Sequence, residues 1–253
     1  MILNAFNLQG KVALVTGCDK GLGQGMALGL AEAGCDIVSV SRSVPQETAQ
    51  KVQALGRRLY ASQADLSRPD SIADIVPAAL AAAGRIDILV NNAGTIRRED
   101  ALSFSEKDWD EVMNLNLKSV FFLSQAVAKQ FLAQGSGGKI INIASMLSFQ
   151  GGIRVPSYTA SKSGVLGITR LLANEWAAHH INVNAIAPGY MATNNTQQLR
   201  DDAERSKEIL DRIPAARWGT PEDLKGPVVF LASPASDYIN GYTVAVDGGW
   251  LAR

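Results

Sequence analysis

The chain has 253 residues, of which 47% are hydrophobic and 19% charged, and its 24 Lys and Arg residues balance its 24 Asp and Glu residues. This balance creates no net field toward nucleic acid or a membrane surface, and no apolar run reaches the about 18 residues of a membrane span, so we expect neither as a partner. Two cysteines and two adjacent histidines, His179 and His180, argue against a metal site and against a histidine-based triad.

The amino-terminal segment MILNAFNLQGK has neither a basic start nor a long apolar stretch. It is therefore not typical of a secretory signal peptide. Cys18 falls in a glycine-rich turn and Cys35 directly before a strand, which favours small buried thiols over a disulfide. We expect a cytoplasmic protein.

Short apolar segments that favour strands alternate with longer segments that favour helices. The predicted strands are 11–16, 36–41, 58–63, 86–91, 139–144, 181–187 and 242–246. Nearly continuous apolar strands are typical of a sheet that is buried on both faces, and the alternation predicts parallel strands. No Pro- or Ser-rich linker divides the chain. We therefore predict one doubly wound α/β Rossmann domain over 1–253, with a seven-stranded parallel sheet.

The longest stretch without a predicted strand in the second half of the chain is 190–240. It contains the polar run TNNTQQLRDDAERSKE, which we predict as a helix pair near 190–212. A helical segment beyond the strand ends is a candidate lid over a substrate.

A glycine-rich turn follows the first predicted strand and begins a helix. Gly17, Gly21 and Gly23 form the pattern T-G-x-x-x-G-x-G. Glycines let the backbone approach a pyrophosphate closely, and the N–H groups at a helix start face the anion. A glycine turn can also be purely structural, but its place at the start of an α/β chain predicts dinucleotide binding.

The end of the second predicted strand indicates which dinucleotide binds. An acid there would hold the ribose hydroxyls of NAD, but the strand ends in Ser41 and Arg42. Arg42 could pair with the 2′-phosphate of NADP, and Lys20 in the glycine turn could add a second positive charge. Both could instead be solvated surface cations. We favour NADP, with NAD as the alternative.

The segment PSYTASKSG places Tyr158 and Lys162 four residues apart, on one face of a predicted helix. A half-buried tyrosine beside a solvated lysine is the ordinary explanation of such a pair. The functional explanation is a proton donor and acceptor. A free tyrosine has a pKa of about 10, and a nearby ammonium group lowers that value toward neutrality.

Six motifs occur in order and resemble those of the short-chain dehydrogenase/reductase family over essentially the whole chain. They are TGCDKGLG at 16–23, NNAG at 91–94, NLNLKSVF around Asn116, IINIAS ending at Ser145, YTASK at 158–162 and PGYMAT at 188–193. The resemblance implies an NAD(P)-dependent oxidoreductase that acts on a CH–OH group and is commonly a homotetramer.

A closer resemblance within the family is carried by NAFNLQGKVALVTGCDKGLGQGMA, NNAGTIRREDALSFSEKDW and NIASMLSFQGGIRVPSYTASKSG. It implies a keto/hydroxy sugar acid as the substrate, with interconversion of 2,5-diketo-3-deoxygluconate and 2-keto-3-deoxygluconate during uronate and pectin breakdown. The alternatives are gluconate 5-dehydrogenase and 3-oxoacyl-thioester reductase activity. A non-enzymatic dinucleotide sensor is the alternative from a different class.

The resemblance also implies roles for individual residues. The implied catalytic residues are Asn116, Ser145, Tyr158 and Lys162. The implied cofactor contacts are Gly17, Lys20, Gly21, Leu22, Gly23, Ser41, Arg42, Asp65, Leu66, Asn92, Ala93, Gly94, Tyr158, Lys162, Pro188, Gly189 and Thr193. A sugar acid also needs a cation for its carboxylate, for which we expect Arg154 and then Arg97. Gln150 and Met191 are further candidate substrate contacts.

Overall fold

The computed structural model describes residues 1–253, with the side chain of Pro69 left out of the description. Seven parallel strands form one sheet in the order β3-β2-β1-β4-β5-β6-β7. Their bounds are β1 Val12–Thr16, β2 Asp36–Ser41, β3 Leu59–Gln63, β4 Ile88–Asn91, β5 Gly138–Ile143, β6 Ile181–Pro188 and β7 Thr243–Val246. The predicted seven-stranded Rossmann sheet is confirmed.

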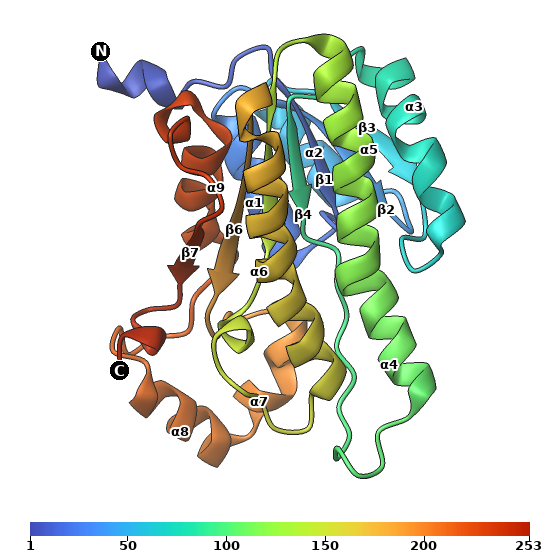
Figure 1. Ribbon diagram of the computed structural model, residues 1–253. Coiled ribbons are helices and arrows are strands. Elements are labelled where there is room, and N and C mark those ends of the chain that lie inside the picture. Colours follow the sequence, from blue (N-terminus) through green and yellow to red (C-terminus); the bar gives the residue numbers. More distant parts are fainter.

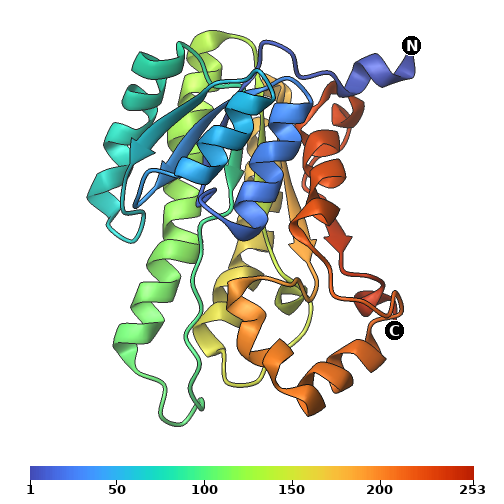
Figure 2. The ribbon, with the colours of Figure 1, turned by 180° about the vertical axis from the view of Figure 1, so that it is seen from behind.

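Helices cover both faces of the sheet. One face carries α3 (Ile72–Ala83), α4 (Glu106–Met113), α5 (Ser119–Gln134) and α6 (Pro156–Trp176), as Figure 1 shows. The other face carries α1 (Gly21–Glu32), α2 (Gln46–Ala54) and α9 (Lys225–Ala232), which lie in front in Figure 2. Separate clusters of buried aliphatic side chains fill the space on each face, so the strands are apolar on both sides.

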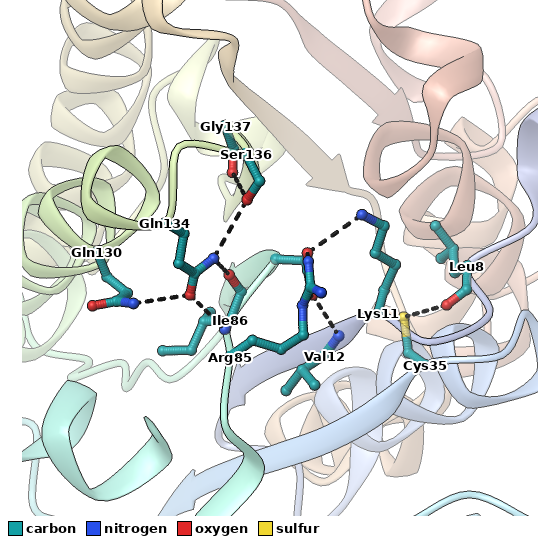
Figure 3. A network of polar contacts seen from close by, with 11 residues as sticks. Leu8, Lys11, Val12, Cys35, Arg85, Ile86, Gln130, Gln134, Ser136 and Gly137 are labelled. Atoms are coloured by element: carbon teal, nitrogen blue, oxygen red, sulfur yellow. Dashed lines mark hydrogen bonds and ion pairs between the residues drawn. The ribbon is translucent and has the colours of Figure 1, made fainter. Parts of the chain in front are cut away.

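The predicted bounds match those observed for β2 and differ by one or two residues for the other strands. The largest difference is at β4, which begins at Ile88 and not at residue 86. Directly before β4, the Asp87 carboxylate accepts a hydrogen bond from Val12 N at 3.0 Å and contacts Arg85 and Lys11. Nearby, Gln134 donates to Ile86 O at 2.8 Å (Figure 3). These polar contacts fasten the amino ends of β1 and β4 together.

The opposite edge of the sheet, where the strands have their carboxyl ends, lies toward the bottom of Figure 1. There α7 (Gln197–Asp201) and α8 (Ala203–Arg212) extend beyond the strand ends, as predicted for the lid near 190–212. No helix in the described part of the chain is long and apolar enough to cross a membrane. Because ligands of parallel α/β sheets bind at the carboxyl ends of the strands, we expect the functional site at this edge.

Candidate active site

The turn between β1 and α1 has a shape that favours glycine. Gly17 and Gly21 have φ angles of +64° and +58°, in the left-handed region. A Cβ on Gly23 would lie 2.2 Å from Gly17 O and 2.4 Å from Nδ2 of Asn92, so no larger residue fits there. Leu22 packs against the core, and α1 begins at Gly21 with its first N–H groups at the turn. These residues fit an anionic group such as a pyrophosphate.

The segment after β4 is fastened to this turn. Asn92 Nδ2 donates to the carbonyl oxygens of Thr16 and Gly17, both at 2.9 Å. Thr16 Oγ1 accepts from the backbone N–H groups of Asn92 and Ala93 at 3.0 and 2.9 Å. The side chain of Asn92 therefore holds the backbone of the glycine turn. This contact differs from the cofactor contact that the sequence predicts for Asn92.

The end of β2 carries polar and cationic groups. Ser41 is buried, and its Oγ has no hydrogen-bond partner among the residues that the structure describes. Arg42 and Lys20 are both exposed. An orphaned hydroxyl beside an exposed guanidinium fits the ribose 2′-phosphate end of NADP.

Asp65 follows β3 and is held by its own turn. Its Oδ1 accepts from Ser67 Oγ at 2.7 Å and Ser67 N at 3.0 Å. These hydrogen bonds, and then the charge of Arg42, hold the pKa of Asp65 below its usual value. The side chain of Leu66 lies in the core, so only its backbone can face a cofactor.

Asn116 lies in a π-helical turn, η3 (Asn114–Lys118), between α4 and α5. The side chain is fully buried. Its Oδ1 accepts from Thr95 N at 2.8 Å, and its Nδ2 donates to Thr95 O at 2.9 Å and to Ser161 Oγ at 3.3 Å. A Cβ on Gly94 would lie 3.2 Å from Asn116 Oδ1. Asn116 thus joins the loop after β4 to α6, and its role in holding a water stays a prediction.

Ser145 directly follows β5 and begins a short 3₁₀ helix, η4 (Met146–Ser148). Its Oγ accepts from Leu147 N at 3.1 Å, which fixes the side chain at the strand end. Ser148 Oγ donates to Lys162 O at 2.7 Å, so this loop packs directly on the helix of Tyr158 and Lys162.

Tyr158 and Lys162 lie in the first turns of α6. Lys162 is buried, its Nζ donates to Ile143 O at 2.6 Å, and it lies 5.7 Å from the centroid of the Tyr158 ring. Burial lowers the pKa of Lys162 to about 8. Burial raises the pKa of Tyr158, although hydrogen bonding with Ser145 and the charge of Arg98 lower it. Desolvation therefore outweighs the two effects that lower the tyrosine pKa, and the expected lowering by Lys162 is not one of them in the unliganded chain.

The loop after β6 closes the other side of the site. Pro188 ends β6, and a Cβ on Gly189 would lie 2.5 Å from Asp247 Cα, so this backbone approach requires glycine. A Cβ on Gly21 would lie 3.8 Å from Thr193 Cγ2. Thr193 therefore lies against the start of α1, next to the proposed pyrophosphate position.

The two arginines expected to bind a carboxylate both have acidic partners. Arg154 has φ +63°, is 57% exposed in its side chain, and places Nε 3.5 Å from Asp100 Oδ1. Arg97 contacts Glu111 and Asp108 on α4. Arg97 therefore points toward α4, and the structure does not bring it to Tyr158.

The other two candidate substrate residues are also engaged elsewhere. Gln150 Oε1 accepts a hydrogen bond from Trp250 Nε1 at 3.0 Å. Met191 is buried in the core, with its Sδ only 2.3 Å from the position of a Cβ on Gly219. Its backbone can border a ligand, but its side chain is a packing residue.

Two further arginines, neither of them expected from the sequence as a substrate contact, donate to backbone carbonyl oxygens of the segment that follows β6. The charge of Arg98 acts on Tyr158, and its Nη2 donates to Asn195 O at 3.3 Å. Arg200 on α7 donates to Thr193 O at 3.2 Å, and within the described residues its buried Nε has no partner. The sequence signal for Arg98 was the pair of arginines that follows NNAG. Because acidic side chains on α4 contact Arg97, Arg98 is the member of the pair that is available to bind a ligand.

The short chain dehydrogenase family is matched over residues 11–204. The 2-dehydro-3-deoxy-D-gluconate 5-dehydrogenase of Dickeya dadantii is 76% identical over 253 residues, which is the full length of both chains.

Solved structures give the same result. A protein of Agrobacterium tumefaciens with bound NADP, provisionally assigned as a 2-deoxy-D-gluconate 3-dehydrogenase, is 56% identical with a TM-score of 0.93 and covers 99% of this chain and 100% of its own. A gluconate 5-dehydrogenase of Burkholderia cenocepacia, in complex with NADP and tartrate, is 39% identical with a TM-score of 0.94, and the match covers 100% of both chains.

Proposed function

The chain belongs to the short-chain dehydrogenase/reductase family. Within this family, we propose that it is a 2-dehydro-3-deoxy-D-gluconate 5-dehydrogenase. The reaction interconverts 2-keto-3-deoxygluconate and 2,5-diketo-3-deoxygluconate. The observation that carries the proposal is the 76% identity over the full length of the Dickeya dadantii enzyme. The contacts of Tyr158 with Ser145 and with Lys162 support the chemistry.

NADP is the cofactor that the residues favour. The glycine turn, the orphaned Ser41 Oγ and the exposed Arg42 and Lys20 fit its pyrophosphate and 2′-phosphate. Two of the similar structures have NADP bound, which supports the same cofactor here. When bound, NADP would supply the acceptor for the hydride of the carbinol carbon in oxidation, and NADPH would supply the hydride donor for the ketone in reduction.

The residues of the chain move the proton and hold the oxygen. In oxidation, Tyr158 accepts the proton of the substrate hydroxyl, and in reduction it donates that proton to the developing alkoxide. Ser145 donates a hydrogen bond to the same oxygen and stabilises its charge. Lys162 places a positive charge 5.7 Å from the Tyr158 ring, which favours the phenolate during oxidation.

Arg98 is the residue we propose for the carboxylate of the sugar acid. Its charge reaches Tyr158, whereas Arg97 and Arg154 face acidic side chains. A guanidinium can bind a carboxylate through two parallel hydrogen bonds, which fixes the orientation of the carbon chain.

The deciding experiment is steady-state reduction of 2,5-diketo-3-deoxygluconate by purified protein, with NADPH and NADH compared as kcat/KM. We expect turnover that favours NADPH. Turnover that favours NADH would keep the substrate and make Lys20 and Arg42 ordinary surface cations. Gluconate and an acetoacetyl thioester are the comparison substrates, and a higher kcat/KM on either would overturn the substrate assignment.

Tyr158→Phe separates an enzyme from a dinucleotide sensor. The variant should bind NADPH as tightly as the wild type but lose turnover by about a thousandfold, because the proton donor is absent. Turnover within a few fold of the wild type would contradict the role of Tyr158.

We also propose a homotetramer. Phe122 and Leu132 on α5 and Leu171 on α6 are 40–49% exposed, on the helical face in front in Figure 1. An apolar helix face of this kind fits a protein–protein interface. The single domain over 1–253 and the cytoplasmic location stay predictions.

A further inference from the structure

The apolar contacts of the lid converge on Trp250, near the carboxyl terminus. We call this group the tail cluster: its buried members are Met146, Ile209, Ile213 and Trp250, and Tyr190, Leu199, Trp218 and Leu251 pack against them. α8 itself is polar, and Ile209 is its one buried residue. The position of α8 against the rest of the molecule therefore depends on this cluster.

Trp250 also joins two segments of the site through specific contacts. Its Nε1 donates to Gln150 Oε1 at 3.0 Å, in the loop that follows Ser145. The guanidinium of Arg212, the last residue of α8, lies 4.0 Å from the centroid of the Trp250 ring. Such a cation–π contact adds to the attraction from apolar burial. One side chain thus contacts both the lid and the loop that carries a proposed catalytic residue.

The backbone of the tail is shaped to hold this side chain in place. The Asp247 carboxylate accepts from Gly249 N and Leu251 N, both at 2.9 Å. Gly249 has φ +90°, and a Cβ there would lie 3.0 Å from Pro214 Cγ, directly after the lid. Arg253 Nη2 donates to Asp211 O at 2.6 Å, in the last turn of α8. The tail therefore contacts the end of the lid at several independent points.

We propose that Trp250 is a positioning residue, which holds α8 against the Ser145 loop and so keeps the lid in place over the substrate. It acts through Gln150 and Arg212, and it has no assigned contact with a reacting atom. The kinetic part of this proposal rests on the proposed function, whereas the structural part concerns the lid alone.

The test is Trp250→Phe, which keeps an aromatic ring but removes the N–H group that binds Gln150. Because one hydrogen bond is lost and the cation–π partner is weaker, we expect KM for the sugar acid to rise about five- to tenfold, with kcat and the Kd for NADPH within about twofold. A purely structural weakening would not divide KM from kcat in this way.

Limited trypsin digestion reports on the lid without any substrate. Arg200, Arg205, Lys207 and Arg212 are cleavage sites within α7 and α8. Cleavage there should become about five- to tenfold faster in Trp250→Phe, because the segment detaches more often. Trp109→Phe is the matched control, since Trp109 lies on α4 and is not a member of the tail cluster.

Arg212→Met is a second route to the same result, since it removes the cation but keeps an apolar stem. It should also accelerate cleavage at the three sites that remain, Arg200, Arg205 and Lys207, and the double variant should show less than the sum of the two effects. The proposal is wrong if lid cleavage or KM stays at the wild-type value in Trp250→Phe, or if Trp109→Phe changes both equally. If the wild type turns over no sugar acid, the proposed function fails, and the cleavage assay alone decides the role of Trp250.

Discussion

Arg97 and Arg98 are neighbours in the chain, but their side chains serve different parts of the molecule. Arg97 contacts Glu111 and Asp108 on α4, so it fastens a loop to a helix. Arg98 instead donates a hydrogen bond to Asn195 O at 3.3 Å, and its positive charge lowers the pKa of Tyr158. A surface ion pair such as that of Arg97 contributes about 0–1 kcal/mol, whereas a cation whose charge lowers the pKa of Tyr158 favours its phenolate.

Arg98→Gln should therefore have two effects. KM for the sugar acid should rise about ten- to hundredfold, because the charge-assisted contact with the carboxylate is lost. The pH profile of kcat/KM for oxidation should also move to higher pH, because the charge that lowers the pKa of Tyr158 is gone. Steady-state kinetics over a pH series measure both.

Arg97→Gln is the control, since it removes the same charge one residue away. It should leave KM and the pH profile close to those of the wild type. Equal effects in the two variants would show that general charge, and not the position of Arg98, is responsible.

Lys162 makes the unliganded protein less stable at neutral pH than it would be without a buried ammonium. Burial lowers its pKa from 10.5 to about 8, so between these values the unfolded chain binds more protons than the folded chain. The free energy of unfolding therefore rises with pH across this range. The Lys162→Met variant has no titrating group at this position. Between about pH 7.5 and 10, the free energy of unfolding of the wild type should therefore rise by about 1–3 kcal/mol relative to that of the variant.

Urea denaturation at several pH values measures this difference. Below about pH 7 Lys162 is charged in both the folded and the unfolded state, and the difference in stability between the wild type and the variant should be constant. A wild type that loses stability relative to the variant as the pH rises would contradict the lowered pKa of Lys162.

At the scale of elements, the β1–α1 turn is the part that tolerates substitution least. Gly23→Ala would place a methyl group 2.2 Å from Gly17 O, so the turn must open. We expect the Kd for NADPH to rise about a hundredfold, which corresponds to about 3 kcal/mol. Calorimetric titration measures it.

Gly167→Ala is the matched control for this change. Gly167 lies in α6 with no atom within 4 Å of an added Cβ. The substitution should leave cofactor binding unchanged and stabilise the chain by about 0.5–1 kcal/mol. If Gly23→Ala binds NADPH as well as Gly167→Ala does, the turn is not the pyrophosphate site.

The elements themselves could be predicted from the sequence because their causes are local. An apolar strand followed by a glycine turn and a helix predicts the same local structure in any chain. Each predicted strand is present, with both bounds within two residues of the predicted ones. Side-chain directions depend on distant partners and could not be predicted. Met191 is a core residue because Gly219 leaves room for its sulfur. Gln150 accepts a hydrogen bond from Trp250, which lies 100 residues later in the chain, so this contact has no local signal.

At the scale of the whole molecule, the face formed by α5 and α6 has the properties of a twofold interface. A groove between the two helices is lined by Phe121, Gln125, Ala128, Lys129, Leu132, Leu171, Leu172, Glu175 and Trp176. A twofold contact requires one surface to complement itself, and this one offers an apolar centre with Lys129 and Glu175 beside it. Two copies related by a twofold axis could bury the leucines and pair the opposite charges.

Leu171→Glu tests this arrangement, because it places a carboxylate at the centre of the apolar surface. Desolvating that charge costs several kcal/mol per copy, which is comparable to the free energy that holds a standard interface together. Sedimentation equilibrium should show a tetramer for the wild type and a smaller species for the variant. Leu55→Glu is the control, since Leu55 is similarly exposed but lies after α2 on the opposite face of the sheet, and it should leave the mass unchanged. A Leu171→Glu variant that keeps the wild-type mass would place the interface elsewhere on the molecule.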